Sequence, residues 1–372
     1  MPPPPVAAAR SPSGPTAPLR VFIVDDSSVV RAFVRGVLER ASDVTLVGTA
    51  ADGAAAVRRL EGLEVDVVLL DVEMPVRDGL DALPDILSAP VRPPKVVMAS
   101  TLTRRGASIS IQALVRGAAD YVAKPTSLQA GGAETFATLL LEKVRAWGAK
   151  VRQERARPSA RPAARPAAPS PRPAPLTCGT RPEALAIGCS TGGPQALIRL
   201  FTRLRGCRLG PVFVTQHMPP TFTALFAEQL ARISERPCHE AVDGETVVAG
   251  GIYVAPGDWH LLAEGRAGAV RLRRTQGPPE NYCRPSADPM FRSLAAVYGP
   301  RLVALVLTGM GHDGCAGARA IADKGGTVLA QDEASSVVWG MPGAVTRAGL
   351  ARETLDLDAL AGRVAQLFAS AP

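Results

Sequence analysis

Three residues in the second half of this 372-residue sequence could perform acyl transfer, and each follows a short apolar run. Ser190 lies in Gly-Cys-Ser-Thr-Gly-Gly (188–193), which fits the G-x-S-x-G pattern of a serine on a sharp strand-to-helix turn. His217 follows the run 211–216, and Asp313 follows the run 303–308 through a glycine-rich turn. A serine needs such a base because its hydroxyl is a weak acid near neutral pH, and a carboxylate can hold the imidazole in the required tautomer.

Other residues near this set could compete for the same roles. His312 precedes Asp313 and ranks second as the base, because neighbouring loop residues usually point apart. Cys189 ends an apolar run without an activating cation in sequence, so we interpret it as a packing residue, and we expect His239 and His260 to pack or to face solvent. The chain order Ser, His, Asp differs from the Ser, Asp, His order of α/β-hydrolases, so we expect another fold family.

The first half contains a second chemical set, made of carboxylates. Asp25 and Asp26 close one apolar run, and Asp71 closes another. Parallel strands bring their carboxyl ends to one edge of a sheet, where three clustered carboxylates would repel one another unless a cation joined them. Oxygen ligands favour Mg²⁺. Lys124 and Ser100 also end apolar runs, so they can supply a positive charge and a hydroxyl to a phosphoryl group at the same edge.

Alternating elements must position both sets. From 19 to 150, short β-branched runs at 21–26, 44–49, 65–71, 95–100 and 120–124 alternate with segments of helical spacing such as 29–40 and 134–147. Five βα units in this order predict a flavodoxin-like, doubly wound α/β domain with a parallel sheet.

The second half repeats this pattern. Strand-like runs are found at 185–189, 212–216, 251–254, 303–308 and 327–331, and helical runs at 194–204, 224–234, 288–297 and 314–322. We therefore expect a second doubly wound, mostly parallel α/β domain. The segment 253–274 is rich in turn residues and predicts antiparallel hairpins within that domain.

The charge of +8 is concentrated between the two halves. Residues 143–181 contain ten Lys or Arg and one acidic residue, and 157–175 contain seven Pro, six Ala, four Arg and two Ser. This composition predicts an extended spacer without a core. The expected organisation is a disordered tail (1–18), a first domain (19–150), a flexible linker (151–182) and a second domain (183–370). The basic charge belongs to the linker, so we expect no nucleic-acid partner.

Composition also limits the compartment. The six cysteines show no C-x-x-C spacing, which favours reduced thiols. The start of the chain lacks the apolar core of a signal peptide, and no apolar run approaches about 18 residues, the length of a membrane span. We expect a cytoplasmic protein without membrane insertion.

The first half resembles the receiver domain of response regulators. The matching segments are Val-Asp-Asp-Ser (24–27), Leu-Leu-Asp-Val-Glu-Met-Pro-Val-Arg-Asp-Gly (69–79), Met-Ala-Ser (98–100) and Gly-Ala-Ala-Asp-Tyr-Val-Ala-Lys-Pro (117–125). The resemblance implies that Asp71 accepts a phosphoryl group from a sensor-kinase histidine. It implies that Asp25, Asp26 and Asp71 hold Mg²⁺ with the backbone carbonyl of Glu73. Ser100, Tyr121 and Lys124 match the positions that respond to phosphorylation.

The second half, from about 184 to the end, resembles the catalytic domain of the chemotaxis protein-glutamate methylesterases, the CheB family. The matching segments are 187–193, 215–220, 253–257, 277–279, 284–288, 307–314 and 331–335. The resemblance implies that Ser190, His217 and Asp313 hydrolyse glutamyl methyl esters of chemoreceptors without a cofactor, with receptor glutamine deamidation as a second activity. Backbone amides near Thr191 and Met310 are candidates for the oxyanion hole.

Two other functional classes remain as alternatives. A response regulator whose second domain only binds a partner would show no effect of replacing Ser190 by Ala. A transcription regulator would use the basic linker on DNA, but no helix-turn-helix pattern with a basic recognition helix follows the first domain. A receiver that covers the serine site until Asp71 is phosphorylated connects the two halves most directly.

Overall fold

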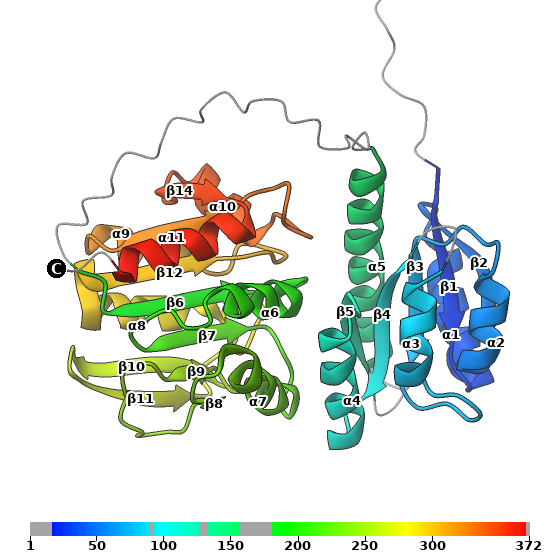
Figure 1. Ribbon diagram of the computed structural model, residues 1–372, viewed down its shortest axis with the longest axis horizontal. Coiled ribbons are helices and arrows are strands. Elements are labelled where there is room, and N and C mark those ends of the chain that lie inside the picture. The colour runs from blue at the N-terminus through cyan, green and yellow to red at the C-terminus, as the bar shows by residue number, and fades with distance from the viewer. Residues whose placement is uncertain (1–16, 90–92, 126–131, 157–180, 370–372) are drawn as a thin grey trace, which may run out of the picture.

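The computed structural model describes residues 17–89, 93–125, 132–156 and 181–369. These residues form two α/β domains that lie side by side (Figure 1). Both the predicted spacer 157–175 and nearly all of the predicted tail 1–18 lie outside the described residues.

The first domain is a five-stranded parallel sheet with the order β2-β1-β3-β4-β5. Its buried strands β1 and β3 end at Val24 and Asp71, so that Asp25 and Asp71 reach the same edge. The fold confirms the predicted doubly wound class. The elements are β1 (Leu19–Val24), α1 (Ser28–Glu39), β2 (Val44–Ala50), α2 (Gly53–Leu60), β3 (Val67–Asp71), α3 (Gly79–Leu87), β4 (Lys95–Thr101), α4 (Arg104–Val115), β5 (Asp120–Lys124) and α5 (Gly132–Ala156).

Helix α5 is much longer than the helical run 134–147 that the apolar spacing indicates. It continues past 150, the expected end of the first domain, and includes the first six residues of the predicted linker. Polar and basic side chains on its last turns make contacts that the apolar spacing does not show. Lys150 donates to the carbonyls of Ala334 (2.6 Å) and Ser336 (3.0 Å), which belong to the second domain.

The second domain contains a seven-stranded sheet with the order β14-β13-β12-β6-β7-β9-β8, in which all paired strands are parallel. This matches the predicted α/β class. The elements are β6 (Ala184–Cys189), α6 (Gly193–Arg203), β7 (Val212–Gln216), α7 (Phe222–Ser234), β8 (Cys238–Glu240), β9 (Ile252–Val254), β10 (His260–Arg266), β11 (Ala269–Thr275), α8 (Ala287–Tyr298), the 3-10 turn η1 (Gly299–Arg301), β12 (Leu302–Val306), α9 (Cys315–Asp323), β13 (Thr327–Gln331), α10 (Met341–Arg347), β14 (Glu353–Leu355) and α11 (Leu357–Ala369).

Among the named strands of this domain in the described residues, the antiparallel pair is the hairpin β10–β11, which forms a sheet of its own. Its inward side chains Leu261, Ala263, Val270 and Leu272 are buried against the second domain's core. The turn-rich segment 253–274 therefore begins with the end of β9 in the main sheet and continues as one hairpin outside it, whereas the sequence predicts several hairpins within the domain.

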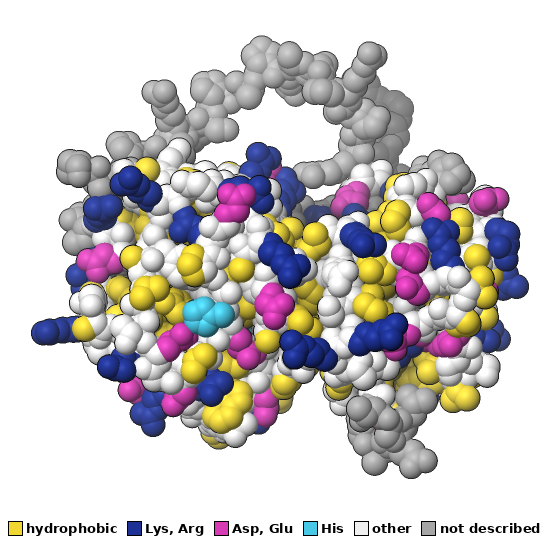
Figure 2. All heavy atoms as spheres, turned by 60° about the horizontal axis from the view of Figure 1, so that its bottom comes forward, with side chains coloured by type: hydrophobic (Ala, Val, Ile, Leu, Met, Phe, Trp, Pro, Cys, Tyr) yellow, Lys and Arg dark blue, Asp and Glu magenta, His cyan; other side chains and the backbone are white. Residues whose placement is uncertain are grey.

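The carboxyl ends of β6, β7 and β12 point toward the receiver-like domain, whose facing elements are α4, β5 and α5 (Figure 1). On the face drawn in Figure 2, basic and acidic side chains are interspersed over both domains. None of the helices in the described part of the chain has the length and apolarity needed to cross a lipid bilayer.

Candidate functional site

Ser190 occupies a sharp turn between the end of β6 and the start of α6. Gly192 adopts a left-handed conformation (φ 76°) in this turn. A side chain on Gly193 would clash with the Gln216 amide, and a Cβ on Gly309 would lie 2.9 Å from that of Ser190. The elbow therefore requires small residues on two sides of the serine, because the surrounding backbone approaches it closely.

A continuous hydrogen-bond chain joins the three residues that the sequence singled out. His217 follows β7, and its Nδ1 lies 3.1 Å from Ser190 Oγ. Its Nε2 lies 2.7 Å from Asp313 Oδ2. In the neutral imidazole the aspartate carboxylate accepts the Nε2 proton, so Nδ1 carries the lone pair that faces the serine hydroxyl. This geometry is suited to removing the serine proton.

Asp313 is buried, with 1% of its surface exposed, and several donors satisfy its carboxylate. Ser286 Oγ donates to Oδ1 (2.6 Å), and the backbone amide of Ala287 donates to Oδ2 (2.6 Å). Although burial acts to raise it, the hydrogen bonds from His217 and Ser286 hold the pKa of Asp313 well below its usual range. Asp313 is therefore ionised at neutral pH.

The environment also changes the basicity of the histidine. Burial acts to lower the pKa of His217, but the hydrogen bonds with Asp313 and with Cys283 outweigh it and raise this pKa to about 9. The Cys283 Sγ atom lies 3.3 Å from Nδ1, the nitrogen that faces Ser190. The sequence reasoning missed Cys283, because it lies between two of the matching segments and at no recognisable spacing from the histidine.

The other three histidines and Cys189 lie in positions that do not suit them to act as base or nucleophile. His312 is exposed, whereas His260 is buried between Pro278 and Ser286 and His239 pairs with Glu245. Cys189 is fully buried, and burial raises the pKa of its thiol far above the usual range. These placements leave His217 in contact with Ser190.

The oxyanion candidates flank the serine. Thr191 follows Ser190 in the elbow, and Met310 follows Gly309, whose Cα lies against Ser190. In the described part of the chain, neighbouring amides are already used, since Ser190 N donates to Thr308 O and Gly309 N donates to Val338 O. The amides of Thr191 and Met310 have no such backbone acceptor among the described residues.

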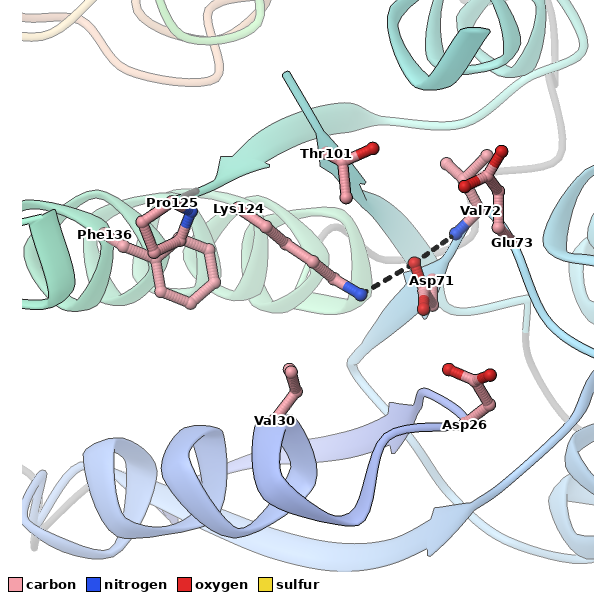
Figure 3. A pocket seen from close by; sticks show the side chains of 9 residues that line it. All are labelled: Asp26, Val30, Asp71, Val72, Glu73, Thr101, Lys124, Pro125 and Phe136. Atoms are coloured by element: carbon pink, nitrogen blue, oxygen red, sulfur yellow. Dashed lines mark hydrogen bonds and ion pairs between the residues drawn. The ribbon is translucent and has the colours of Figure 1, made fainter. Parts of the chain in front are cut away.

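Asp26 and Asp71 of the acidic set line a cavity of about 430 Å³ at the carboxyl edge of the first domain's sheet (Figure 3). Lys124 Nζ lies 2.7 Å from both Asp71 Oδ1 and Asp25 Oδ2. Burial raises the pKa of Asp71 to about 6, against the opposing effect of Lys124. Asp25, Asp26 and Asp71 each have one carboxylate oxygen that lies within 4.8 Å of the corresponding oxygens of the other two. Three clustered carboxylate oxygens fit a hard divalent cation such as Mg²⁺.

The other residues singled out in this domain are divided between the cavity and the domain interface. Glu73 lines the cavity together with Thr101, which is one residue beyond Ser100 (Figure 3). Strand β4 ends at Thr101 and not at Ser100, and the buried Ser100 hydroxyl donates to the Thr101 carbonyl (3.1 Å). Tyr121 is buried away from the cavity, where its ring stacks on Phe222 of the second domain.

The receiver-like domain contacts the serine elbow itself. The buried Asp120 accepts a hydrogen bond from Gly192 N (3.4 Å), two residues after Ser190. Gln195, in the first turn of α6, donates to the Leu114 carbonyl (2.7 Å) and to the Ala118 carbonyl. The elements that hold the nucleophile thus form part of the interface between the two domains.

Comparison with known families gives one match for each domain. Residues 185–364 match the model of the CheB methylesterase family, and residues 21–131 match the model of the response regulator receiver domain.

Curated relatives match nearly the whole chain. One from Azospirillum brasilense, named protein-glutamate methylesterase/protein-glutamine glutaminase, is 46% identical and aligns with 99% of this chain and 98% of its own. One from Caulobacter vibrioides with the same activities in its name is 48% identical over 93% of this chain and 98% of its own.

Solved structures resemble each domain separately. The Thermotoga maritima CheB methylesterase catalytic domain is 36% identical, covers 50% of this chain and 100% of its own, and has a TM-score of 0.48. The response regulator domain of Thermotoga maritima CheB is 37% identical, covers 36% of this chain and 97% of its own, and has a TM-score of 0.33.

Proposed function

The chain belongs to the CheB methylesterase family, and from this premise we propose that Ser190, His217 and Asp313 hydrolyse glutamyl methyl esters on chemoreceptors and release methanol. The same residues would deamidate specific receptor glutamines, the second activity in the names of the relatives. The observation that carries this proposal is the unbroken hydrogen-bond chain from Ser190 Oγ through His217 to Asp313.

The geometry suggests how each group would act. Ser190 Oγ attacks the ester carbonyl carbon while its proton passes to Nδ1 of His217. The protonated imidazole then gives this proton to the departing methoxide, which leaves as methanol. A water molecule attacks the acyl-enzyme with the same histidine as base, which restores Ser190 and releases the glutamate side chain. Asp313 holds the Nε2–H throughout and stabilises the imidazolium.

The negative charge on the tetrahedral intermediate needs donors beside Ser190. We propose the backbone amides of Thr191 and Met310 for this role, since both flank the serine and lack a backbone acceptor among the described residues. The N-terminus of α6 adds a favourable partial charge on the same side of the serine.

In the receiver domain, Asp71 would accept a phosphoryl group from the histidine of a chemotaxis-type kinase. Asp25, Asp26 and Asp71, together with the Glu73 carbonyl, would hold Mg²⁺, which neutralises charge on the phosphoryl oxygens when bound. The Lys124 ammonium, between Asp25 and Asp71, would pair with the phosphorylated side chain. Ser100 and Tyr121 would then change their packing.

The interface supports a gate between the two activities. Asp120 and Tyr121 are neighbours in β5, and they contact Gly192 and Phe222, which lie beside the serine and histidine loops. We propose that the docked receiver keeps the helical receptor substrate from Ser190, and that phosphorylation of Asp71 weakens this docking. The cysteines of the described residues form no disulfide, and this arrangement together with the proposed kinase donor favours action in the cytoplasm.

The test is methanol release from methylated receptor membranes, with and without a small-molecule phosphodonor. We expect release by the wild-type chain to increase with the phosphodonor, Ser190→Ala to release none, and Asp71→Asn to lose the stimulation while keeping a basal rate. A folded chain lacking residues 1–180 should be active without phosphodonor. Absence of release from wild type on several receptors would favour a second domain that only binds a partner. Stimulation that survives in Asp71→Asn would remove the gate but keep the esterase.

A further inference from the structure

A two-residue turn lies over the carboxylate side of the triad. Glu280 N donates to Cys283 O (3.2 Å), and Cys283 N donates to Glu280 O (2.9 Å). The two central residues, Asn281 and Tyr282, have left-handed backbone angles, with φ of 53° and 62°. Asparagine tolerates this region, but an aromatic residue rarely adopts it. The turn therefore maintains a costly backbone conformation directly beside the reactive residues.

The turn directs the Asn281 amide inward, to two carboxylates at once. Asn281 Nδ2 donates to Asp313 Oδ1 (2.9 Å) and to Asp288 Oδ2 (2.8 Å). Both carboxylates are buried, with 1% and 3% of their surfaces exposed. A side-chain amide has two protons on one nitrogen and can serve two acceptors, whereas a hydroxyl has one proton and a carboxylate has none.

The second carboxylate makes this bridge necessary. Burial and the charge of Asp313 raise the pKa of Asp288, while hydrogen bonds from Gly317 and Asn281 act against the rise. Asp288 Oδ1 accepts from Gly317 N (2.6 Å), so Asp288 also joins helix α8 to helix α9. Two buried carboxylates this close repel each other unless donors lie between them.

The bridge is one of the contacts that determine which oxygen of Asp313 faces the histidine. Oδ1 accepts from Asn281, from Ser286 Oγ and from the backbone amides of Asp288 and Gly314, and this leaves Oδ2 for His217 Nε2 and the Ala287 amide. Asn281 is the donor that Asp313 shares with Asp288, so its loss would leave the repulsion between the two carboxylates less well compensated. That repulsion would displace Asp313 and lengthen the hydrogen bond that orients the imidazole.

We propose that Asn281 is a positioning residue for the esterase reaction, acting through an amide bridge between the Asp313 and Asp288 carboxylates that fixes Asp313 on His217. The inference rests on the proposed roles of Ser190, His217 and Asp313. Asn281 acts on the aspartate and not on the receptor, so its loss reduces the catalytic rate and leaves receptor affinity unchanged.

The experiment uses the full chain with phosphodonor and methylated receptor membranes, and measures kcat and KM for methanol release. Asn281→Gly removes the amide but retains a residue that accepts the left-handed backbone. Tyr282→Gly is the matched control, because it changes the next residue of the same turn and removes a fully exposed side chain. We expect Asn281→Gly to lower kcat by about 10- to 100-fold at unchanged KM, and Tyr282→Gly to keep kcat within about twofold, as is usual for an exposed position.

A double-mutant comparison tests the bridge itself. Asp288→Asn removes one of the two charges, so the loss caused by Asn281→Gly should be smaller in the Asp288→Asn background. Equal losses in both backgrounds, or equal losses for Asn281→Gly and Tyr282→Gly, would overturn the inference. Unchanged kcat in Asn281→Gly would also overturn it, whereas an inactive wild type would instead refute the proposed function.

A spectroscopic measurement does not depend on turnover. The Nε2 proton shared by His217 and Asp313 should give a downfield proton resonance, to be assigned by its absence in His217→Gln. We expect this resonance to shift or broaden in Asn281→Gly and to remain in Tyr282→Gly, with both variants checked for a folded state by circular dichroism. An unaltered resonance in a folded Asn281→Gly chain would contradict the positioning role.

Discussion

The ring of Tyr121 stacks on the ring of Phe222, with centroids 4.5 Å apart and planes inclined by 14°. Tyr121 belongs to β5 of the receiver domain, and Phe222 begins α7 directly after the loop that contains His217. The position expected to respond to phosphorylation is therefore in direct contact with the domain that contains the triad. Both rings are buried. Because the contact joins the two domains, it exists only while they are docked.

Removing the ring of Tyr121 should activate the unphosphorylated enzyme. A stacked aromatic pair contributes about 1 kcal/mol beyond its buried area, so Tyr121→Ala should raise the basal rate of methanol release about fivefold. Tyr121→Phe retains the stacking and should keep the basal rate low. If Tyr121→Ala showed the wild-type basal rate, this contact would not hold the receiver in place.

We expect the histidine to act as a base only with the Asp313 carboxylate in place. In Asp313→Asn the side-chain amide can present a donor to His217 Nε2, which favours the tautomer with a proton on Nδ1, facing Ser190. We expect kcat to fall by about 10⁴-fold with the fold retained. Steady-state methanol release and circular dichroism measure the two quantities, and a loss below about tenfold would assign the base another partner.

The pH profile should report the basicity of His217. The imidazole must be neutral to accept the serine proton, and its pKa is raised to about 9, so kcat/KM should rise with pH up to that region. A Cys283 sulfur that accepts from protonated Nδ1 stabilises the imidazolium and is one cause of the raised pKa, and therefore Cys283→Ala should move the acid limb to lower pH. Cys207→Ala, which changes a thiol in the loop after α6, should leave the limb in place. A limb that stayed fixed in Cys283→Ala would argue against the thiol–imidazole contact.

Removing divalent cations should separate the two activities. The cluster of Asp25, Asp26 and Asp71 would lose its ion in EDTA, which should abolish phosphorylation by a small-molecule phosphodonor. The triad has no proposed metal, so the basal, Ser190-dependent release of methanol should continue in EDTA. Readdition of Mg²⁺ should restore the stimulation in wild type and not in Asp71→Asn. Basal activity that disappeared with EDTA would point to a metal requirement in the catalytic domain.

Sequence patterns predicted the features of this protein that depend on the succession of strands and helices along the chain. Ser190, His217 and Asp313 each follow a buried parallel strand, and parallel strands carry their successors to a common edge, so their convergence could be anticipated. The α/β class of both domains followed from the same alternation of apolar runs.

Contacts between distant segments could not be predicted in this way. Asn281 reaches Asp313 because a two-residue turn reverses the chain beside the triad, and the sequence Asn-Tyr gives no clear signal for that turn. The last turns of α5 are polar and basic, and their contacts are with the second domain, so a search for apolar periodicity ends the helix too early.

Gly192 takes part both in the serine elbow and in the contact with the receiver. Its left-handed backbone shapes the serine elbow, a Cβ there would lie 2.6 Å from Val337, and its amide donates to Asp120 of the receiver. Mutational drift at Gly192 would therefore damage catalysis before it could release the enzyme from regulation. Under the proposed gate, changes at Asp120 or Tyr121 would leave the triad intact, so in evolution an always-active form would be reached more readily through the receiver than through the esterase domain.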